Sequence, residues 1–314
     1  PKLKYKIELG LSNRDISGAN VYNRNTPRYI LDAVVMWNFH ENFELWAGQT
    51  KLPGNIERVV SSANLQLIDR SLLNSKFNID RDMGIQLRHK LRLGGNWIIK
   101  EKFSISQGEG RNITEGNIGG LQYTSRLELL PFGEFSSKGD YSQGDLKREK
   151  SIKAMFGFTY DINENAVKSR SNMGSYLIQS SGGLFETDIT TIFLDGVIKY
   201  NGFALTGEYA NRDADQIEAL EEDGRTKTGA VVGAGSASNI QGSYLFKNNF
   251  EITARYTNIN FKKITRLSDL KQITFGVSKY VVGHSLKIQA DISLLNASGI
   301  KDNVLFRTGF DLHF

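Results

Sequence analysis

Long segments of this sequence alternate between apolar and polar residues, and this period of two recurs along nearly the whole chain. In residues 2–11, leucine, tyrosine and isoleucine fill the odd positions, whereas lysine and glutamate fill the even positions up to Glu8. The same alternation recurs in residues 29–39 and 82–92. Successive side chains of a β-strand point to opposite faces, so the pattern predicts strands with one apolar and one polar face.

The strands are too long for an ordinary soluble sheet. We count about 14 segments of about eight to twelve residues, whereas soluble strands usually have about five or six. Ten residues at ~3.3 Å each, tilted by about 45°, match the height of an apolar bilayer band. Aromatic residues such as Trp37, Phe39 and Trp97 stand near strand ends, where a membrane-interface girdle is expected. We therefore predict an all-β fold: a transmembrane antiparallel up-and-down β-barrel, with residues 1–314 forming a single domain.

The connections between these segments alternate between short and long. The short ones are 40–42, 94–96, 201–202, 247–249 and 281–284. The long polar ones are 12–27, 52–81, 108–119, 161–188, 212–229, 259–270 and 295–302. Tight periplasmic turns and long extracellular loops produce this alternation in outer-membrane barrels. Residues 131–150 are the exception, a polar stretch where a turn is expected, and they indicate either a weak hairpin or a periplasmic projection.

Composition and motifs exclude several other functions. A net charge of +5, from 39 basic and 34 acidic residues, is too small an excess to indicate nucleic-acid binding. The chain has no cysteine, and its four histidines lie far apart without metal-ligand spacing. Serines are plentiful, but none has an evident base partner. We predict no catalytic residues, no cofactor and no metal, and therefore no enzyme.

A specific motif block resembles a known family. Residues 46–87 contain Gly48-Gln49-x-Lys51-x-Pro53, Glu57-Arg58, Asp69-Arg70-Ser71 and Arg81-Asp82-x-Gly84. This block resembles the phosphate-selective porin O and P family in its Bacteroidetes-type branch, as do residues 127–135 and the terminal strand. The resemblance implies a trimeric pore of about 16 strands with a long loop, here residues 52–81, folded into the lumen. We therefore also expect an N-terminal hairpin to be missing from the 314 residues.

Basic residues are the candidates for lining the pore. The family resemblance implies that Arg58, Arg70, Lys76 and Arg81 face the lumen from the inward loop, in which residues 63–73 have the pattern of a short helix. On the strands, the lumen-facing candidates are Arg88, Lys100, Lys102 and Arg126. Guanidinium donors match the oxygens of phosphate. Alternatively, Glu57, Asp69, Asp80 and Asp82 neutralise these cations as structural salt bridges.

The predicted function is passive diffusion of small hydrophilic solutes through the outer membrane, favouring anions and including phosphate-like solutes. The predicted contacts are membrane lipid, lipopolysaccharide, small anionic solutes and a second and third copy of the chain. The alternative is a plugged barrel that serves as a scaffold in an outer-membrane secretion or uptake assembly. In that case it docks partner proteins through residues 131–150 or the long loops.

Overall fold

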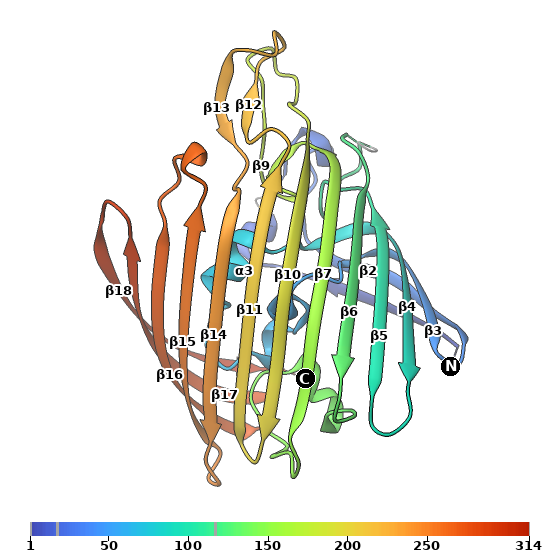
Figure 1. The fold of residues 1–314 in the computed structure, drawn as a ribbon, viewed down its shortest axis with the longest axis vertical. Helices are drawn as coiled ribbons and strands as arrows, with labels where there is room; N and C mark the ends of the chain where they lie inside the picture. The colour runs from blue at the N-terminus through green and yellow to red at the C-terminus, as the bar shows by residue number, and fades with distance from the viewer. Residues whose placement is uncertain (1, 17–18, 116–117, 314) are drawn as a thin grey trace.

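Fourteen antiparallel strands form one large sheet, and each pairs with its neighbour in chain order, as the sequence predicted (Figure 1). The computed structural model describes residues 2–16, 19–115 and 118–313. The strands are β1 (Leu3–Leu9), β2 (Ile30–His40), β3 (Phe43–Lys51), β4 (Arg81–Arg92), β5 (Ile98–Ser106), β6 (Gln122–Leu130), β7 (Lys153–Ala166), β10 (Thr187–Tyr200), β11 (Phe203–Ala214), β14 (Gly235–Leu245), β15 (Phe250–Phe261), β16 (Leu270–Val282), β17 (Leu286–Ala297) and β18 (Ile300–Leu312).

The sheet curls round a central space, with β1 and β18 at its two edges (Figure 1). Among the described residues each of these edge strands pairs with one neighbour, β1 with β2 and β18 with β17. None of the described helices has both the length and the apolar character needed to cross a membrane.

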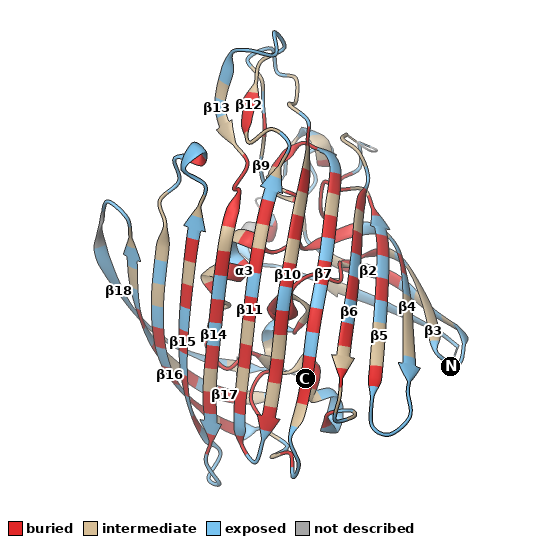
Figure 2. Ribbon diagram, viewed as in Figure 1, coloured by how far each residue is buried: buried red, intermediate tan, exposed pale blue. Residues whose placement is uncertain are grey.

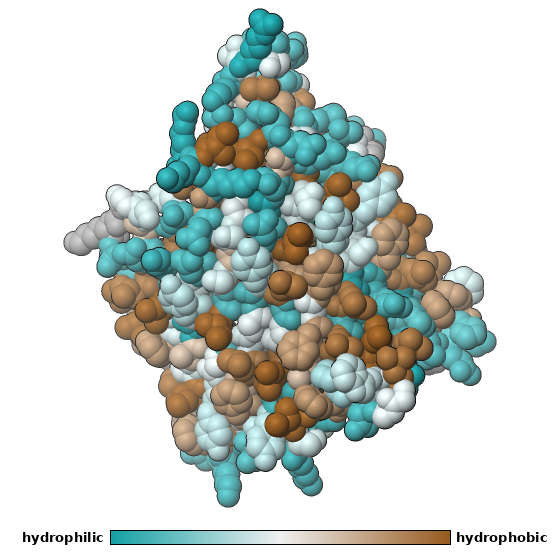
Figure 3. All heavy atoms as spheres, in the orientation of Figure 1, coloured by the Kyte–Doolittle hydropathy of each residue, from teal (hydrophilic) through white to brown (hydrophobic). Residues whose placement is uncertain are grey.

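Burial alternates along most of the strands, such as β6, β10, β14 and β15, as the period of two predicted (Figure 2). In β2, Asp32 and Val34 are buried on the inner face, whereas Val35, Trp37 and Phe39 are exposed on the outer face. The outer apolar residues gather in a broad area across the lower part of the sheet in Figure 3. Ile240 of β14, Ile252 of β15 and Phe275 of β16 are each more than half exposed. A folded chain exposes so much contiguous apolar surface only where another apolar phase covers it.

The short connections lie at one end of the sheet, here called the turn end, and most of the long ones at the other, the loop end (Figure 1). One predicted loop is wrong. Residues 295–302 are mostly strand, because Leu295 pairs with Asn303 and Ala297 with Ile300, which leaves only Ser298 and Gly299 as a tight turn. Loop 161–188 is shorter than predicted, because β7 continues to Ala166 and β10 begins at Thr187.

Small elements stand at the loop end. The hairpin β12–β13 rises beyond the ends of the long strands (Figure 1). The turn of the hairpin β8–β9 lies inside the barrel, where Ser171 contacts Asp161 and Asn172 accepts from Asp80 N. Their bounds are β8 (Lys168–Arg170), β9 (Met173–Tyr176), β12 (Glu218–Leu220) and β13 (Lys227–Val231). The short helices of the loops are α1 (Asn13–Ile16), η1 (Val21–Asn23) and η4 (Lys263–Thr265).

Residues 52–80, here called the inner loop, lie on the concave side of the sheet. They contain α2 (Ile56–Val59), η2 (Ser62–Asn64) and α3 (Leu72–Phe77). The predicted helix over residues 63–73 is wrong. Residues 65–70 are not helical because their backbone bonds to other parts of the protein: Ile68 N donates to Asp291 Oδ2, and Leu65 O accepts from Lys287 Nζ. Helix α3 begins only after Ser71, whose hydroxyl accepts from Asn74 N at 3.1 Å.

Residues 131–150 form neither a strand hairpin nor an outward projection, so both predicted alternatives are wrong. They contain η3 (Ser136–Tyr141) and fold back against the inner face of the sheet at its turn end. Lys199 Nζ donates to the carbonyl oxygens of Gly139, Ser142 and Gly144 at 2.7, 2.7 and 2.5 Å. These bonds give the segment partners that no neighbouring residue in the sequence supplies.

Candidate pore and its lining

A cavity of about 1670 Å³ lies inside the sheet, between the inner loop and the wall formed by β1–β4 and β15–β18. It extends from Arg111 and Ser175 at the loop end to Trp46 and Arg88 toward the turn end. Thirteen basic side chains line it, against five acidic ones. The basic residues are Lys6, Arg28, Lys51, Arg58, Arg70, Lys76, Arg81, Arg88, Arg111, Lys168, Arg170, Arg255 and Arg307. The positive excess of the lining therefore exceeds that of the whole chain, which is +5.

The inner loop is fixed to the wall by a buried ion pair. Arg126 of β6 and Asp195 of β10 form two parallel hydrogen bonds of 2.7 Å, and both side chains are fully buried. Arg126 Nη1 also donates to Gly54 O at 3.0 Å, and Asp195 Oδ2 accepts from Ile56 N at 3.2 Å. Buried charges are tolerated only when they are paired and hydrogen-bonded. This clamp therefore holds the start of the inner loop in one place.

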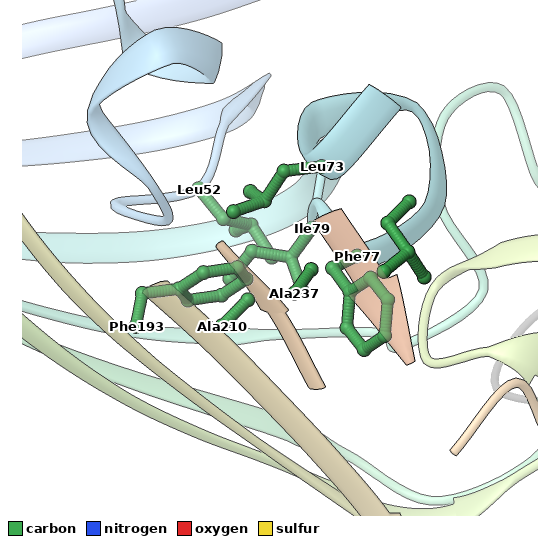
Figure 4. Close-up of a cluster of buried hydrophobic side chains, with 8 residues drawn as sticks. Leu52, Leu73, Phe77, Ile79, Phe193, Ala210 and Ala237 are labelled. Atoms are coloured by element: carbon green, nitrogen blue, oxygen red, sulfur yellow. The ribbon is translucent and has the colours of Figure 1, made fainter. Parts of the chain in front are cut away.

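Apolar packing holds the last part of the inner loop, together with Leu52 at its beginning. Leu52, Leu73, Phe77 and Ile79 pack against inward-facing residues of β10, β11, β14 and β15 (Figure 4). The wall residues in this cluster are Phe193, Ala210, Ala237 and Ile259. The small alanines leave room for the loop, and the buried apolar area contributes about 25 cal/mol per Å². The inner loop is therefore part of the core and not a loose excursion into the cavity.

Glu57 ties the middle of the inner loop together. Its carboxylate accepts from Ser71 N at 3.0 Å, and its own backbone N–H donates to Glu208 Oε1 at 2.6 Å. Arg255 Nη1 lies 3.7 Å from the same carboxylate. These contacts fold the loop back on itself, and residues 58, 59, 61, 62, 65 and 68–72 line the cavity.

Arg58 and Asp80 form the ion pair at the two ends of the inner loop. Arg58 Nε donates to Asp80 Oδ1 at 2.5 Å, and its Nη2 contacts the second oxygen. Burial alone would raise the pKa of Asp80, but the guanidinium groups of Arg58 and Arg81 outweigh it and hold the pKa below its ordinary value. Arg81 is itself paired with Asp32, at 2.9 Å. The charges of Arg58 and Arg81 are therefore largely compensated.

Lys51 and Arg70 instead donate to neutral backbone oxygens. Lys51 Nζ donates to the carbonyl oxygens of Val59 and Val60 at 3.4 and 3.2 Å. Arg70 Nη2 donates to the same Val60 oxygen at 2.9 Å, and its Nε donates to Glu57 O. Burial, together with the nearby Arg58, lowers the pKa of Arg70 to about 10, so it remains protonated at neutral pH. Two basic side chains thus meet at one neutral oxygen on the cavity surface.

More than half of the basic residues that line the cavity likewise form no ion pair among the described residues. Six of the thirteen pair with a carboxylate: Lys6, Arg58, Arg81, Arg111, Arg255 and Arg307. The other seven form no ion pair with the residues that the structure describes. Arg170 donates to Ser75 O, and Lys168 donates to Glu109 O. Within the described chain, the buried Arg28 Nε has no hydrogen-bond partner at all. A cavity lined by more cations than carboxylates attracts anions.

The eight residues selected from the sequence divide into two groups. Arg58, Arg70, Lys76, Arg81 and Arg88 line the cavity, with the Arg88 guanidinium 3.5 Å above the Trp46 ring. Lys100, Lys102 and Arg126 do not line it. Lys102 donates to Glu128 and to Tyr141 at 2.6 and 2.7 Å, and Lys100 pairs with Asp140 at 2.5 Å. Residues 131–150 therefore separate these two lysines from the cavity.

The same segment fills the turn end of the lumen together with the inner loop. Gln143 N donates to Asn64 O, and Gln143 Oε1 accepts from Gln66 N at 2.9 Å. Lys287 Nζ donates to Ala63 O and Leu65 O from the wall beside them. Burial lowers the pKa of His284, whose Nε2 lies 3.1 Å from Gln143 O, to about 4. The open space is consequently confined to the side of β1–β4 and β15–β18.

Several lining residues were not among those predicted from the sequence. Lys51 lies within the motif block of residues 46–87, and Arg255 and Arg307 have the lumen-facing parity of their strands. The motif block and the strand parity could therefore have identified these three residues from the sequence. Lys168 and Arg170 lie in a predicted loop, and only the β8–β9 hairpin brings them to the cavity. No sequence pattern indicates that placement.

The chain is similar to known proteins over most of its length. The sequence profile described as phosphate-selective porin O and P matches residues 1–293. An uncharacterised protein of Aquifex aeolicus is 27% identical over 308 residues, which cover 91% of this chain and 68% of that protein. OprB of Pseudomonas putida, in a structure determined at high pH, is 8% identical with a TM-score of 0.53, and the match covers 92% of this chain and 73% of OprB. At that identity the likeness concerns the fold.

Proposed function

Because this chain belongs to the phosphate-selective porin O and P family, we propose that its pore passes small anions in preference to cations. The family and the barrel fold make it an integral outer-membrane porin, which passes small hydrophilic solutes by passive diffusion. The turn end of the barrel therefore faces the periplasm and the loop end faces the exterior. The proposal assigns no catalytic step to the chain.

The observation that carries the proposal is the pair Lys51 and Arg70 at the Val60 carbonyl. Each side chain donates to backbone oxygens and forms no ion pair with a carboxylate among the described residues. An anion that enters the cavity gains attraction from both charges, whereas a cation is repelled by both. Guanidinium groups also offer donors spaced for carboxylate and phosphate oxygens, so phosphate-like solutes belong to the proposed range.

The inner loop sets the width of the path in this proposal. Residues 52–80 contact β6, β7, β10, β11, β14, β15 and β17 from inside the barrel. In the proposed single domain, solutes therefore pass through the space that remains on the opposite side of the lumen. Arg58, Arg70 and Arg81 border that path together with Lys51. We propose that this is the constriction and that the Arg126–Asp195 pair positions it without touching solute.

Zero-current potentials across a planar bilayer in a potassium chloride gradient test this function. We expect the wild-type pore to show a chloride-to-potassium permeability ratio above about 3, because the lining excess is positive. In the double variant Lys51→Gln, Arg70→Gln the ratio falls toward one. Lys247→Gln, which removes the same charge from an exposed turn, leaves it unchanged. A cation-selective wild-type pore contradicts the proposal.

A further inference from the structure

The cavity has an apolar wall as well as a basic one. Phe261, Leu270, Leu295 and Leu305 line it, one from each of the adjacent strands β15, β16, β17 and β18. Each has inward parity: Phe261 lies two residues beyond the buried Ile259, Leu295 two beyond the buried Ser293, and Leu305 two before Arg307. Lumen faces of wide porins are ordinarily polar. Four apolar residues on neighbouring strands therefore require an explanation.

Packing in the buried apolar core does not explain all four of these residues. Leu270 and Phe261 touch the edge of the apolar cluster beneath α3 and remain only partly buried. Leu305 is 47% exposed, on the inner face of β18. Neighbouring strands lie about 4.8 Å apart, so four of them carry this wall over about 14 Å. Packing against the inner loop therefore explains Phe261 and Leu270, but it does not explain Leu295 and Leu305.

The inner loop contributes further apolar surface beside its cations. Ile68 and Leu72 line the same cavity as Arg70. Arg307, on the same strand as Leu305, is held by Asp69 of the inner loop and by Asp291 at 2.8 Å. The basic side, with Lys51 and Arg70, and the apolar side thus border one continuous space of about 1670 Å³. Sites for small organic molecules are typically about 300–1,000 Å³, so the space exceeds what an inorganic ion needs.

We infer that this pore favours organic anions that carry an apolar group, such as aryl carboxylates, over small anions of the same charge. The inference rests on the proposed function, because the basic wall must first attract anions. The carboxylate meets Lys51 and Arg70, and the apolar group lies along Phe261, Leu270, Leu295 and Leu305. An inorganic anion gains nothing from that wall, whereas an aryl group loses contact with water there.

Bi-ionic potentials with sodium benzoate on one side of the bilayer and sodium acetate on the other test this inference. Benzoate is larger and diffuses more slowly than acetate in water, so a wide, indifferent pore gives a benzoate-to-acetate permeability ratio below one. We expect a ratio above one for the wild-type pore, by about threefold, because the apolar wall offsets the difference in mobility.

The double variant Leu295→Ser, Leu305→Ser keeps every charge but removes apolar surface. Its benzoate-to-acetate ratio is expected to fall below one, while its chloride-to-potassium ratio stays at the wild-type value, which also shows that the barrel has folded. Leu295→Met, Leu305→Met is the conservative control and retains the wild-type preference.

The outcomes separate the two claims. A wild-type pore that selects chloride over potassium but passes acetate faster than benzoate overturns this inference and leaves the proposed function standing. A benzoate preference that survives in the serine variant also overturns it, because the preference then arises elsewhere. A pore that selects potassium over chloride overturns the proposed function itself.

Discussion

Lys51 and Arg70 donate to the same oxygen, the backbone carbonyl of Val60, at 3.2 and 2.9 Å. Lys51 ends a barrel strand and Arg70 lies in the inner loop, so the loop brings together two like charges that the strand order alone would separate. Like charges this close repel each other. An arrangement that costs stability is retained where function needs it.

The first prediction concerns that cost. Lys51→Met should raise the free energy of unfolding by about 0.5–1 kcal/mol, because it removes repulsion with Arg70 at a half-buried site. The same variant should lose part of its anion preference. Denaturant unfolding in detergent and zero-current potentials measure the two effects. A variant that is less stable yet equally anion-selective would show that Lys51 is structural.

Arg126 should behave as a positioning residue. Arg126→Ala leaves Asp195 buried without its partner and is expected to cost about 3–5 kcal/mol of unfolding free energy. Because the clamp on Gly54 and Ile56 is lost, single-channel records should also show larger and noisier conductance. Lys262→Gln breaks an exposed pair with Asp213 and should cost less than about 1 kcal/mol. A change of under 1 kcal/mol with unaltered conductance in Arg126→Ala would refute the clamp.

The charge of Lys168 gives the pore a pH dependence. Burial, with help from the nearby Arg28, lowers the pKa of Lys168 to about 8. The lysine is therefore charged at neutral pH and becomes neutral as the pH rises through 8, so anion preference should decline between pH 7 and 9. The contribution of Lys168 to the free energy of unfolding changes in the opposite direction as the pH rises. The unfolded chain binds the extra proton between pH 8 and the ordinary lysine value of 10.5, so the contribution of Lys168 to stability rises with pH in that window.

Glu109 must be separated from this effect. Burial raises its pKa to about 7, so it ionises over the lower part of the same range, and its backbone oxygen accepts from Lys168. In Glu109→Gln the decline between pH 7 and 9 should persist in full, whereas in Lys168→Met it should be smaller. Permeability ratios measured at half-unit pH steps distinguish the two. An undiminished decline in Lys168→Met would assign it to another group.

Lys199 should hold residues 131–150 inside the barrel. Lys199→Met removes three hydrogen bonds from buried carbonyl groups and is expected to cost about 2–4 kcal/mol. Trypsin should then cleave faster after the exposed Lys138. Lys153→Met, which removes one bond to Phe132 O, serves as the control. Equal cleavage rates in the two variants would mean that the segment is held mainly by its other contacts.

The strands were predictable because a two-sided environment imposes a period of two on the sequence. The ends of the strands were harder to predict from the sequence. β7 continues through Asp161 and Asn163, which are polar but buried on the inner face, so the loss of apolar residues there does not mark the end of the ladder.

The inner segments were beyond the reach of local patterns. Residues 65–70 have helical spacing, yet their backbone groups bond to Lys287 and Asp291 across the lumen. Tyr141 likewise finds Glu128 and Lys102 only because residues 131–150 fold back. Such partners depend on the curled shape of the sheet, and spacing along the chain does not encode them. The positive charge of the lining could be predicted for strands whose alternation shows which residues face inward. Strand β4, with Arg81 and Arg88, is an example.

The most direct measurement uses the absence of cysteine from the chain. In Ser61→Cys the thiol lies next to Val60, on the exposed surface of the cavity, so reagents that modify it during recording report on the path itself. We expect an anionic methanethiosulfonate to react faster than its cationic counterpart and to reduce the current. Ser181→Cys, at the exposed loop end, should react with both at similar rates. Faster modification of Ser61→Cys by the cationic reagent, or modification without any change in current, would contradict an anion path along Lys51 and Arg70.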